Sequence, residues 1–556
     1  MRVETLVAVL VLSPLAAGVV IVQDQGRRAA PAGPSTELKQ SAYIKASNAE
    51  AYDHFACGGG NQGHSGDSVA ISGDGNTMAV GARYERGGSR GINGNQNDNS
   101  AYAAGAVYVF SRQGDTWVQQ AYVKASNAEQ GDHFGSSVAL SRDGNTLVVA
   151  AQWESSAATG INGNQSDNSI PQAGAVYVFT RTGNIWAQQA YIKASNTGRP
   201  AIGDEPGDGD QFGYSVAIND DGGTIAVGAH VEDSSARTIN GKQTDDSVPS
   251  SGAVYIFTLT GSTWAQQAYL KSSNSEQGDM FGFSVALSAD GNTLVASAFD
   301  ERGSGRGVNP AHDNLANGAG AVYVFTRTGG AWNEQAYLKG SKNEGTDQMG
   351  YSVAISDDGN TIAAGAGDED CLTPGVNPAG CDADSPPRGF ANIWVGAAYV
   401  FVRTGSTWTE QAFIKASNPR PYNSFGVKLA LSGDGTTLAV AAYLQDDAAP
   451  GIHGPQLLPF LIVDHLDPWR NRETQAEESG AAYLYTRSSA TWTQRAYIKS
   501  SNNESGDEFG SAVALSGDGR TMAIGAHNED GGSRGLNGNQ SDNEATNSGA
   551  VYIFTN

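Results

Sequence analysis

Short apolar stretches recur along the chain, separated by polar residues and turn signals. In the best-marked copy, residues 137–141 (SVALS) and 147–151 (LVVAA) flank an Asp-Gly-Asn turn at 143–145, a strong signal for a β-hairpin. A third stretch, 173–181 (AGAVYVFTR), has apolar residues on both faces, which is typical of a strand between two layers. A fourth, 186–196 (WAQQAYIKASN), follows another turn. The pattern therefore predicts units of four strands.

This unit occurs seven times. Its first two stretches are repeated in copies that start at Ser65, Phe134, Phe212, Phe281, Met349, Phe425 and Phe509. Such self-similarity is typical of stacked or circular arrays. Four strands in seven copies predict an all-β, seven-bladed β-propeller with four-stranded blades. A seven-layer solenoid is the alternative.

The two ends of the repeat region favour the propeller. Residues 38–48 (LKQSAYIKASN) match the fourth strand of the unit, and residues 549–556 (GAVYIFTN) match the third. We expect the N-terminal strand to pair with the three C-terminal strands, because this closes the ring and leaves no exposed edge. The propeller should cover residues 38–556, with blades at about 49–127, 128–196, 197–274, 275–343, 344–418, 419–502, and 503–556 together with 38–48.

The N-terminal segment and the net charge bear on localisation. Arg2 precedes an apolar run at residues 6–22, which predicts a signal peptide or an uncleaved anchor over residues 1–22. Residues 23–37 form a polar, Pro- and Ala-containing linker. With 34 basic and 58 acidic side chains the net charge is -24, which disfavours nucleic acid and anionic membranes as partners. We expect an exported protein, either secreted or held at the cell surface or in the periplasm, with no membrane insertion beyond that anchor.

The three cysteines fit an oxidising compartment. Cys371 and Cys381 flank a Pro- and Gly-rich loop (CLTPGVNPAGC), which predicts a small disulfide ring and leaves Cys57 unpaired. The loop contains no histidine, so the zinc signal is weak.

The repeats resemble the FG-GAP repeats of integrin α chains and of bacterial integrin-like propellers. The Phe-Gly pairs are Phe134-Gly135, Phe212-Gly213, Phe281-Gly282, Phe425-Gly426 and Phe509-Gly510, and the Gly-Ala pairs are Gly81-Ala82, Gly228-Ala229, Gly365-Ala366 and Gly525-Ala526. The final proline of the motif is missing. In that family several blades bind calcium in the first hairpin, through D-x-D-x-D-G-x-x-D. The hairpins here have one Asp before Gly, as at Asp74, Asp143 and Asp290, which is too short to wrap an ion. We therefore assign these aspartates to turn formation.

A polar decapeptide marks the opposite face. Residues 91–100 (GINGNQNDNS) return almost unchanged at 160–169 and 535–544. Strand alternation puts these loops on the face away from the hairpins, which in the resembling integrins meets the partner. They are either self-folded structural loops or loops that bind a ligand or cation. The binding-loop candidates are Asn95, Asp98, Asn164, Asp167, Asp245, Asn539 and Asp542.

An acidic pair also recurs on this face. Asp132 precedes the first strand of its blade and Glu154 follows the second, so the two carboxylates should lie close together. The same pair is found as Asp210 with Glu232, Asp279 with Glu301, Asp347 with Glu369, and Asp507 with Glu529. One interpretation is a shared cation, with calcium as the first choice. The other is structural, with backbone capping or with neutralisation by the lysines repeated in the fourth strand, Lys124, Lys193, Lys271, Lys339 and Lys499.

The acidic pair is altered in two blades, one and six. In blade one Glu85 is present, but an insertion after Phe55 is expected to displace Asp53. Blade six replaces both acids by amides, Asn423 and Gln445, and we assign Lys415 to it as its retained lysine. Its loop also contains an apolar stretch at residues 455–469 (PQLLPFLIVDHLDPW), which either packs over the ring or offers a hydrophobic patch.

Together these features predict a non-catalytic, secreted or cell-surface binding or adhesion protein. Its loop-rich face would bind an extracellular protein or glycan. The alternative is an extracellular propeller enzyme, a polysaccharide lyase or hydrolase. The eight histidines show no Ser-His-Asp order, and His54 and His133 share a repeat position that holds other residues elsewhere.

Overall fold

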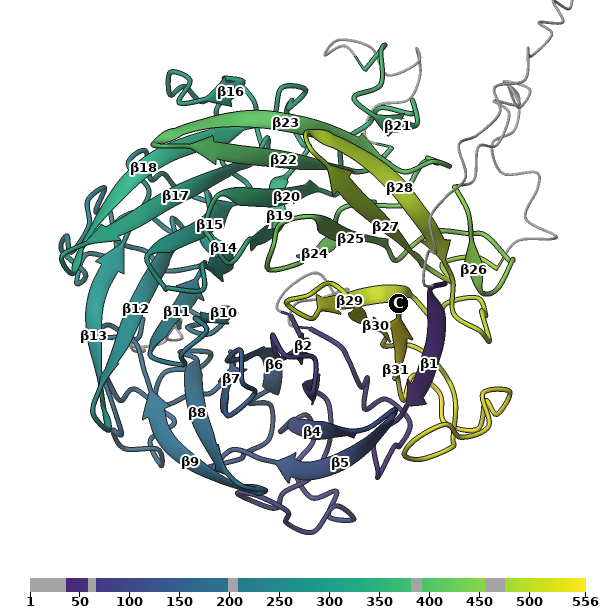
Figure 1. Cartoon of the computed structure of the whole chain (residues 1–556). Helices are drawn as coiled ribbons and strands as arrows, with labels where there is room; N and C mark the ends of the chain where they lie inside the picture. Colours follow the sequence, from purple (N-terminus) through teal and green to yellow (C-terminus); the bar gives the residue numbers. More distant parts are fainter. Residues whose placement is uncertain (1–36, 59–66, 199–208, 382–392, 456–475) are drawn as a thin grey trace, which may run out of the picture. The chain divides into compact units, whose positions relative to one another are not determined.

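The computed structural model describes residues 37–58, 67–198, 209–381, 393–455 and 476–556. Leu38–Asn556 form one compact unit, a ring of seven antiparallel sheets (Figure 1). The predicted all-β, seven-bladed propeller is confirmed. The predicted signal peptide or anchor, almost all of the linker, and nearly all of the apolar stretch 455–469 lie outside the described residues.

The strands of each blade lie side by side in chain order, with the first strand nearest the centre of the ring (Figure 1). Blades one to three contain β2 (Val69–Ile71), β3 (Thr77–Ala82), β4 (Ala106–Gln113) and β5 (Thr116–Val123); β6 (Phe134–Leu140), β7 (Thr146–Ala151), β8 (Ala175–Thr182) and β9 (Ile185–Ile192); and β10 (Ser215–Ile218), β11 (Thr224–Ala229), β12 (Ala253–Thr260) and β13 (Thr263–Leu270). Blades four to six contain β14 (Phe281–Leu287), β15 (Thr293–Ala298), β17 (Ala321–Thr328) and β18 (Ala331–Lys339); β19 (Met349–Ile355), β20 (Thr361–Ala366), β22 (Ala397–Thr404) and β23 (Thr407–Lys415); and β24 (Lys428–Leu431), β25 (Thr437–Ala442), β27 (Ala481–Ser488) and β28 (Thr491–Ile498).

Blade seven closes the ring. It consists of β29 (Phe509–Leu515), β30 (Thr521–Ala526) and β31 (Ala550–Thr555), to which the N-terminal strand β1 (Lys39–Ile44) is added as the fourth strand. β1 runs antiparallel to β31, with Lys39 opposite Thr555 and Ile44 opposite Val551. The predicted pairing of one N-terminal strand with three C-terminal strands is confirmed.

Three blades have a fifth strand that the four-stranded unit did not predict. The two-residue strands β16 (Gly307–Val308), β21 (Gly375–Val376) and β26 (Ile452–His453) pair with the outer edges of β18, β23 and β28. They belong to the loop between the second and third strands, which turns back over the fourth. In blade two the same contact is a single bridge, and Asn162 accepts a hydrogen bond from the Tyr191 N–H at 2.9 Å. The loop thus covers the outer edge strand of the blade.

The cores lie between neighbouring blades. Val107 and Val109 of β4 pack against Phe134 and Tyr177 of blade two. On the other face of β4, Tyr108 packs towards blade seven. Each third strand is therefore buried on both faces, as its apolar pattern predicts.

The repeat phenylalanine of blade one precedes the copy start expected at Ser65 and lies within the expected bounds of the blade, 49–127. Phe55, not Ser65, occupies the position of the repeat phenylalanine, since its ring meets Tyr108 edge-on at 5.4 Å between centroids. Phe134 meets Tyr177 in the same way at 5.3 Å. Ser65 lies outside the described residues. The error arose because the insertion separates Phe55 from the strand that it precedes.

The hairpins between first and second strands are joined in a closed circle of backbone hydrogen bonds. At each step the N–H of one hairpin donates to a carbonyl oxygen of another blade, at 2.8 to 3.2 Å: Asp74 to Arg142, Arg142 to Asp220, Asp220 to Ala289, Ala289 to Asp357, Asp357 to Gly433, Gly433 to Gly517, and Gly517 to Gly73. A Cβ atom added to Gly517 would lie 2.9 Å from the Gly73 oxygen, so this approach requires glycine. The circle fixes the blades to one another on the hairpin face.

Ring closure gives the first testable prediction. Deletion of residues 38–48 removes β1, exposes the edge of β31 and uncovers the apolar face of blade seven. We expect the deletion to abolish cooperative folding or to lower the melting temperature by on the order of 10 °C or more. Circular dichroism on heating measures this. The control is a deletion of residues 1–36, which removes no described strand and should leave the melting temperature unchanged; equal melting temperatures for the two deletions would contradict the prediction.

Candidate functional site

Six blades contain a buried glutamate bound by a lysine, and in five of them four donors from the protein bind the carboxylate. In blade two, Oε1 of Glu154 accepts hydrogen bonds from Tyr191 Oη at 2.9 Å and Asn127 Nδ2 at 3.0 Å. Its Oε2 accepts from Lys193 Nζ at 2.7 Å and from the backbone N–H of Ser156 at 3.1 Å. Asn127 lies on the connection from blade one, so the carboxylate joins two blades.

The same arrangement recurs around the ring. Lysine and tyrosine both bind the glutamate in four further blades, as Lys124 and Tyr122 on Glu85, Lys271 and Tyr269 on Glu232, Lys339 and Tyr337 on Glu301, and Lys45 and Tyr43 on Glu529. In blade five Lys415 binds Glu369, and Phe413 replaces the tyrosine. An ammonium group thus already compensates the charge of each glutamate, which favours the structural interpretation.

The aspartates of the pairs cap a turn. Asp132 Oδ2 accepts a hydrogen bond from the Glu129 N–H at 2.9 Å, and Asp53, Asp279, Asp347 and Asp507 make the equivalent bond. Burial, with the nearby Glu154 carboxylate, raises the pKa of Asp132 to about 7. Asp210 is also buried, and burial raises its pKa well above the usual range. In the described part of the chain, no three His, Cys, Asp or Glu side chains are grouped to hold a metal ion, and calcium stays a prediction.

Two expectations about these pairs were wrong. The insertion in blade one does not displace Asp53, which is buried and accepts a hydrogen bond from the Glu50 N–H at 3.0 Å. Its pKa is raised to about 8 by burial and by Glu85. Lys415 belongs to blade five, since it ends β23, and the lysine of blade six is Lys499, which follows β28.

Blade six therefore holds a lysine without its glutamate. Lys499 Nζ lies 3.2 Å from Gln445 Oε1 and 2.7 Å from Ser479 Oγ. Tyr497 Oη donates to the same amide oxygen at 2.7 Å. Burial lowers the pKa of Lys499 to about 7. Lys499 thus contacts the neutral Gln445 amide where the other blades offer a carboxylate.

The decapeptide loops fold on themselves. Each candidate side chain accepts a hydrogen bond at 3.0 to 3.2 Å from the N–H two residues further on: Asn95 from Asn97, Asp98 from Ser100, Asn164 from Ser166, Asp167 from Ser169, Asp245 from Ser247, Asn539 from Ser541, and Asp542 from Glu544. These are Asx turns, which favour the structural alternative for the loops.

The loops also connect successive blades. Gln165 accepts a hydrogen bond from Ser126 Oγ at 2.5 Å, and its carbonyl oxygen accepts from Asn127 Nδ2 at 3.2 Å. Asn168 Nδ2 donates to Glu129 Oε2 at 2.5 Å. Ser126, Asn127 and Glu129 lie on the connection that enters blade two. The decapeptide therefore recurs because its hydrogen bonds hold the connection between successive blades in place.

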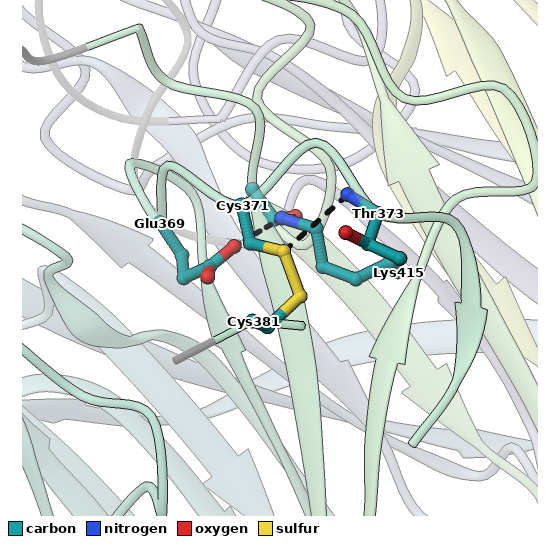
Figure 2. Close-up of a disulfide and its surroundings, with 6 residues drawn as sticks. Glu369, Cys371, Thr373, Cys381 and Lys415 are labelled. Carbon is teal, nitrogen blue, oxygen red and sulfur yellow. Dashed lines mark hydrogen bonds and ion pairs between the residues drawn. A yellow bond between two sulfur atoms is a disulfide. The ribbon is translucent and has the colours of Figure 1, made fainter. Parts of the chain in front are cut away.

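The cysteine loop lies beside one of the buried ion pairs. Cys371 and Cys381 form a disulfide with 5.5 Å between their Cα atoms, and Cys57 is a buried free thiol. Figure 2 shows this disulfide next to Glu369 and Lys415. The Thr373 N–H donates to Cys371 Sγ at 3.3 Å. The disulfide thus ties down the loop that follows Glu369.

A pocket of about 920 Å³ opens on the loop-rich face, where blades one, five, six and seven meet. Arg83 and Tyr84 line it after β3, Tyr443 after β25, and His527 and Asn528 after β30. None of the loop or carboxylate candidates from the sequence lines this pocket. Sequence reasoning missed it because its walls come from segments far apart in the chain.

Seven equivalent residues with left-handed backbone surround this end of the ring. The residue before the repeat Phe or Met has φ between 49° and 58° in every blade, and these residues are His54, His133, Gln211, Met280, Gln348, Ser424 and Glu508. A non-glycine residue in this region is strained, and such strain gathers at functional sites. His54 and Glu508 line the pocket. All seven residues have the same backbone conformation but different side chains. The side chain at this position can therefore change, and with it the ligand that is recognised, without a change of fold.

Burial alters the charges of the pocket. The pKa of His54 is lowered to about 4 by burial and by Arg83. The pKa of Glu508 is raised to about 8 by burial and by Glu478. Glu508 Oε1 accepts a hydrogen bond from Asn528 Nδ2 at 2.9 Å, and its Oε2 lies 3.5 Å from His527 Nε2. At neutral pH, His54 and Glu508 are therefore both uncharged hydrogen-bonding groups.

Comparison with known families agrees with this architecture. The family model described as FG-GAP repeat matches residues 117–179, 201–257, 264–325, 408–454 and 492–554, more than half of the chain. The chain belongs to the FG-GAP repeat family.

Solved structures similar to this FG-GAP chain include two matches of low identity. Hydrazine synthase of Kuenenia stuttgartiensis has a TM-score of 0.43 and 12% identity, over 84% of this chain and 96% of that one. The β-propeller domain of Cps50 (Swd1) of Myceliophteria thermophila has a TM-score of 0.40 and 9% identity, over 89% and 97%. No curated protein matches the sequence.

The structure explains the glycines of the FG-GAP motif. Gly135 of the Phe-Gly pair in blade two lies against Gly81 of the Gly-Ala pair in blade one. A Cβ atom on Gly81 would lie 2.0 Å from the Gly135 oxygen, and Gly135 itself has a φ of 90°. The two halves of the motif are therefore contact points between neighbouring blades. At the contact between Gly81 and Gly135 both positions require glycine, whereas blades two, four and six have Ala150, Ser297 and Ala441 in place of the glycine of the Gly-Ala half.

The second prediction concerns the buried ion pairs. Glu154→Gln removes the charged partner of Lys193 inside the protein, and we expect a loss of about 3–5 kcal/mol in the free energy of unfolding. Denaturant titration measures it. Gln445→Glu in blade six is the matched reverse change, since it gives Lys499 a partner, and it should raise both the unfolding midpoint and the pKa of Lys499. An unfolding midpoint for Glu154→Gln equal to that of the parent chain would rule out this role.

The third prediction concerns pH. Because the pKa of Asp132 is raised to about 7, the folded state binds more protons than the unfolded state between about pH 4 and pH 7. The stabilisation is fully present below about pH 4 and is lost as pH rises through 7, and it amounts to about 4 kcal/mol at most. Asp132→Asn copies Asn423 of blade six. It should raise the melting temperature most at pH 8 and clearly less at pH 5, where only part of the stabilisation has been lost; an equal effect at both values would contradict the assignment.

Proposed function

We propose that this FG-GAP protein is an exported, non-catalytic binding protein that recognises an extracellular protein or glycan with its loop-rich face. The pocket between blades one, five, six and seven is the site of recognition. One observation carries the proposal: this pocket is lined at positions where the blades share a backbone but differ in side chain. Sites of this size and mixed polarity are typical of ligand binding.

The contrast between the two faces of the ring supports the proposal. The hairpin face consists of short turns closed by the circle of backbone hydrogen bonds. The other face bears the long loops and all the residues that line the pocket. Loops on a rigid scaffold are where binding residues concentrate. The repeated glutamates and decapeptides supply that rigidity.

The second candidate is an extracellular lyase or hydrolase. The observation that favours it is the contact between Glu508 and His527 in the pocket, with the pKa of Glu508 raised to about 8 by burial and by Glu478. A carboxyl group that stays protonated near neutral pH can act as a general acid. Release of reducing ends or unsaturated products from polysaccharides would support this candidate over pure binding.

The fourth prediction tests the pocket by filling it. Asn547 lines the pocket and occupies the same repeat position as Trp394 of blade five, with φ of 52° and 47°. Asn547→Trp should therefore fold and obstruct the pocket. We expect binding of the labelled chain to arrayed extracellular proteins and glycans to fall by about tenfold or more.

The matched control is Gln172→Trp, the same position in blade two, which does not line the pocket. It should leave binding unchanged. Equal binding by the two variants and the parent chain would place recognition outside this pocket, and the absence of binding to any arrayed protein or glycan would contradict the proposed function.

A further inference from the structure

Exposed aromatic side chains gather at the pocket. Among the described residues, the aromatic rings with large exposed fractions are Tyr52 (50%), Tyr102 (54%), Trp394 (43%) and Tyr422 (42%). Tyr52, Tyr102 and Trp394 line the pocket, and Tyr422 meets the Trp394 ring at 5.7 Å in an edge-to-face contact. We call these four residues the aromatic rim. Their positions on one pocket mark it as an interaction site.

Two members of the rim occupy a position that other blades fill with glycine. Tyr52 and Tyr422 stand three residues before the repeat Phe, where blades two, four and seven have glycine with φ of 81° to 86°. Both tyrosines keep the left-handed backbone, with φ of 67°. A Cβ atom at the equivalent Gly131 would meet nothing within 4 Å, so this position projects into open space. The backbone of both tyrosines is therefore strained, although their rings remain about half exposed.

Trp394 also differs in kind from the residues at the equivalent position of the other blades. The equivalent residues of the other blades are small or polar, namely Ala103, Gln172, Ser250, Gly318, Glu478 and Asn547, and all have φ between 51° and 63°. Blade five alone places an indole in this strained position. Packing does not account for it, because Trp394 is 43% exposed.

The remaining lining of the pocket is polar, and we call it the polar floor. It includes His54, Glu508, Asn528 and Asn547 together with the charged residues Arg83, Arg86 and Glu478. Burial and Arg83 lower the pKa of His54 to about 4, and burial with Glu478 raises the pKa of Glu508 to about 8. Aromatic rings beside hydrogen-bond donors and acceptors form a surface suited to a molecule with one apolar face and many hydroxyl groups.

We propose that the aromatic rim and the polar floor bind a neutral saccharide. This inference rests on the proposed function and specifies the class of its ligand. A pyranose ring presents C–H groups on its face and hydroxyl groups at its edge. The C–H face stacks on Trp394, with Tyr52 and Tyr422 at the sides. The hydroxyl groups hydrogen-bond to Asn528, Asn547 and Glu508. Ring stacking explains why exposed aromatics are retained in strained positions.

The test uses soluble sugars and the full chain. Oligosaccharides of glucose, galactose, mannose and N-acetylglucosamine are titrated at up to about 10 mM, and binding is measured by calorimetry and by tryptophan fluorescence. Trp394→Ala, Tyr52→Gly and Tyr422→Gly each install the residue of another blade, Ala103, Gly131 or Gly506. We expect at least one sugar to bind, and each variant to weaken it by about tenfold without lowering the melting temperature.

The control is Ile185→Ala, which removes an exposed apolar side chain at the turn between β8 and β9 on the hairpin face and should not alter affinity. Failure of every sugar to bind, or full affinity in the rim variants, would overturn the saccharide proposal. If no sugar binds but an arrayed protein does, and Asn547→Trp blocks that protein, the proposed function stands and only the ligand class is wrong.

Discussion

Two-sided burial of the third strand is the constraint on which the rest of this structure depends. A strand such as β4 has apolar side chains on both faces, so every blade needs a neighbour on each side. In a row of blades the last ones would always lack a neighbour. Only a closed ring satisfies all seven, and the pairing of β1 with β31 completes it. The Phe-Gly and Gly-Ala contacts then bring successive blades close enough for that packing.

Within this ring, repetition and variation have different roles. The positions that repeat hold the molecule together: the buried glutamate with its lysine, the Asx turns of the decapeptide, and the hairpin circle. The positions that vary lie around the pocket, on a backbone that does not change from blade to blade. Blade six differs from the other blades at one of these repeated positions. It has exchanged Glu for Gln445, and its lysine remains beside an amide with a pKa lowered to about 7 by burial.

Much of the fold could be predicted from the sequence, because strand patterns, turn signals and repeat spacing are local. The ring, its closure and the two faces followed from these. The site could not be predicted in the same way. The pocket joins Tyr52, Trp394 and His527, which only the closed ring brings together. One local signal was present: a tyrosine at a position where other copies have glycine, as at Tyr52 and Tyr422. For the acidic pairs the sequence left two interpretations open, a shared cation or neutralisation by the repeated lysines, and the contact between Lys193 and Glu154 favours the second.

The circle of hydrogen bonds on the hairpin face is completed by the seventh blade. Each hairpin donates to one neighbour and accepts from another, so the series is complete only when the seventh returns to the first. An additional copy of the repeat would have to open this circle and leave one donor and one acceptor unpaired until a wider circle formed. Individual residues can therefore change freely around the pocket, while whole repeats cannot be gained or lost one at a time without a cost. The geometry at the centre preserves sevenfold order in a chain whose blades have diverged.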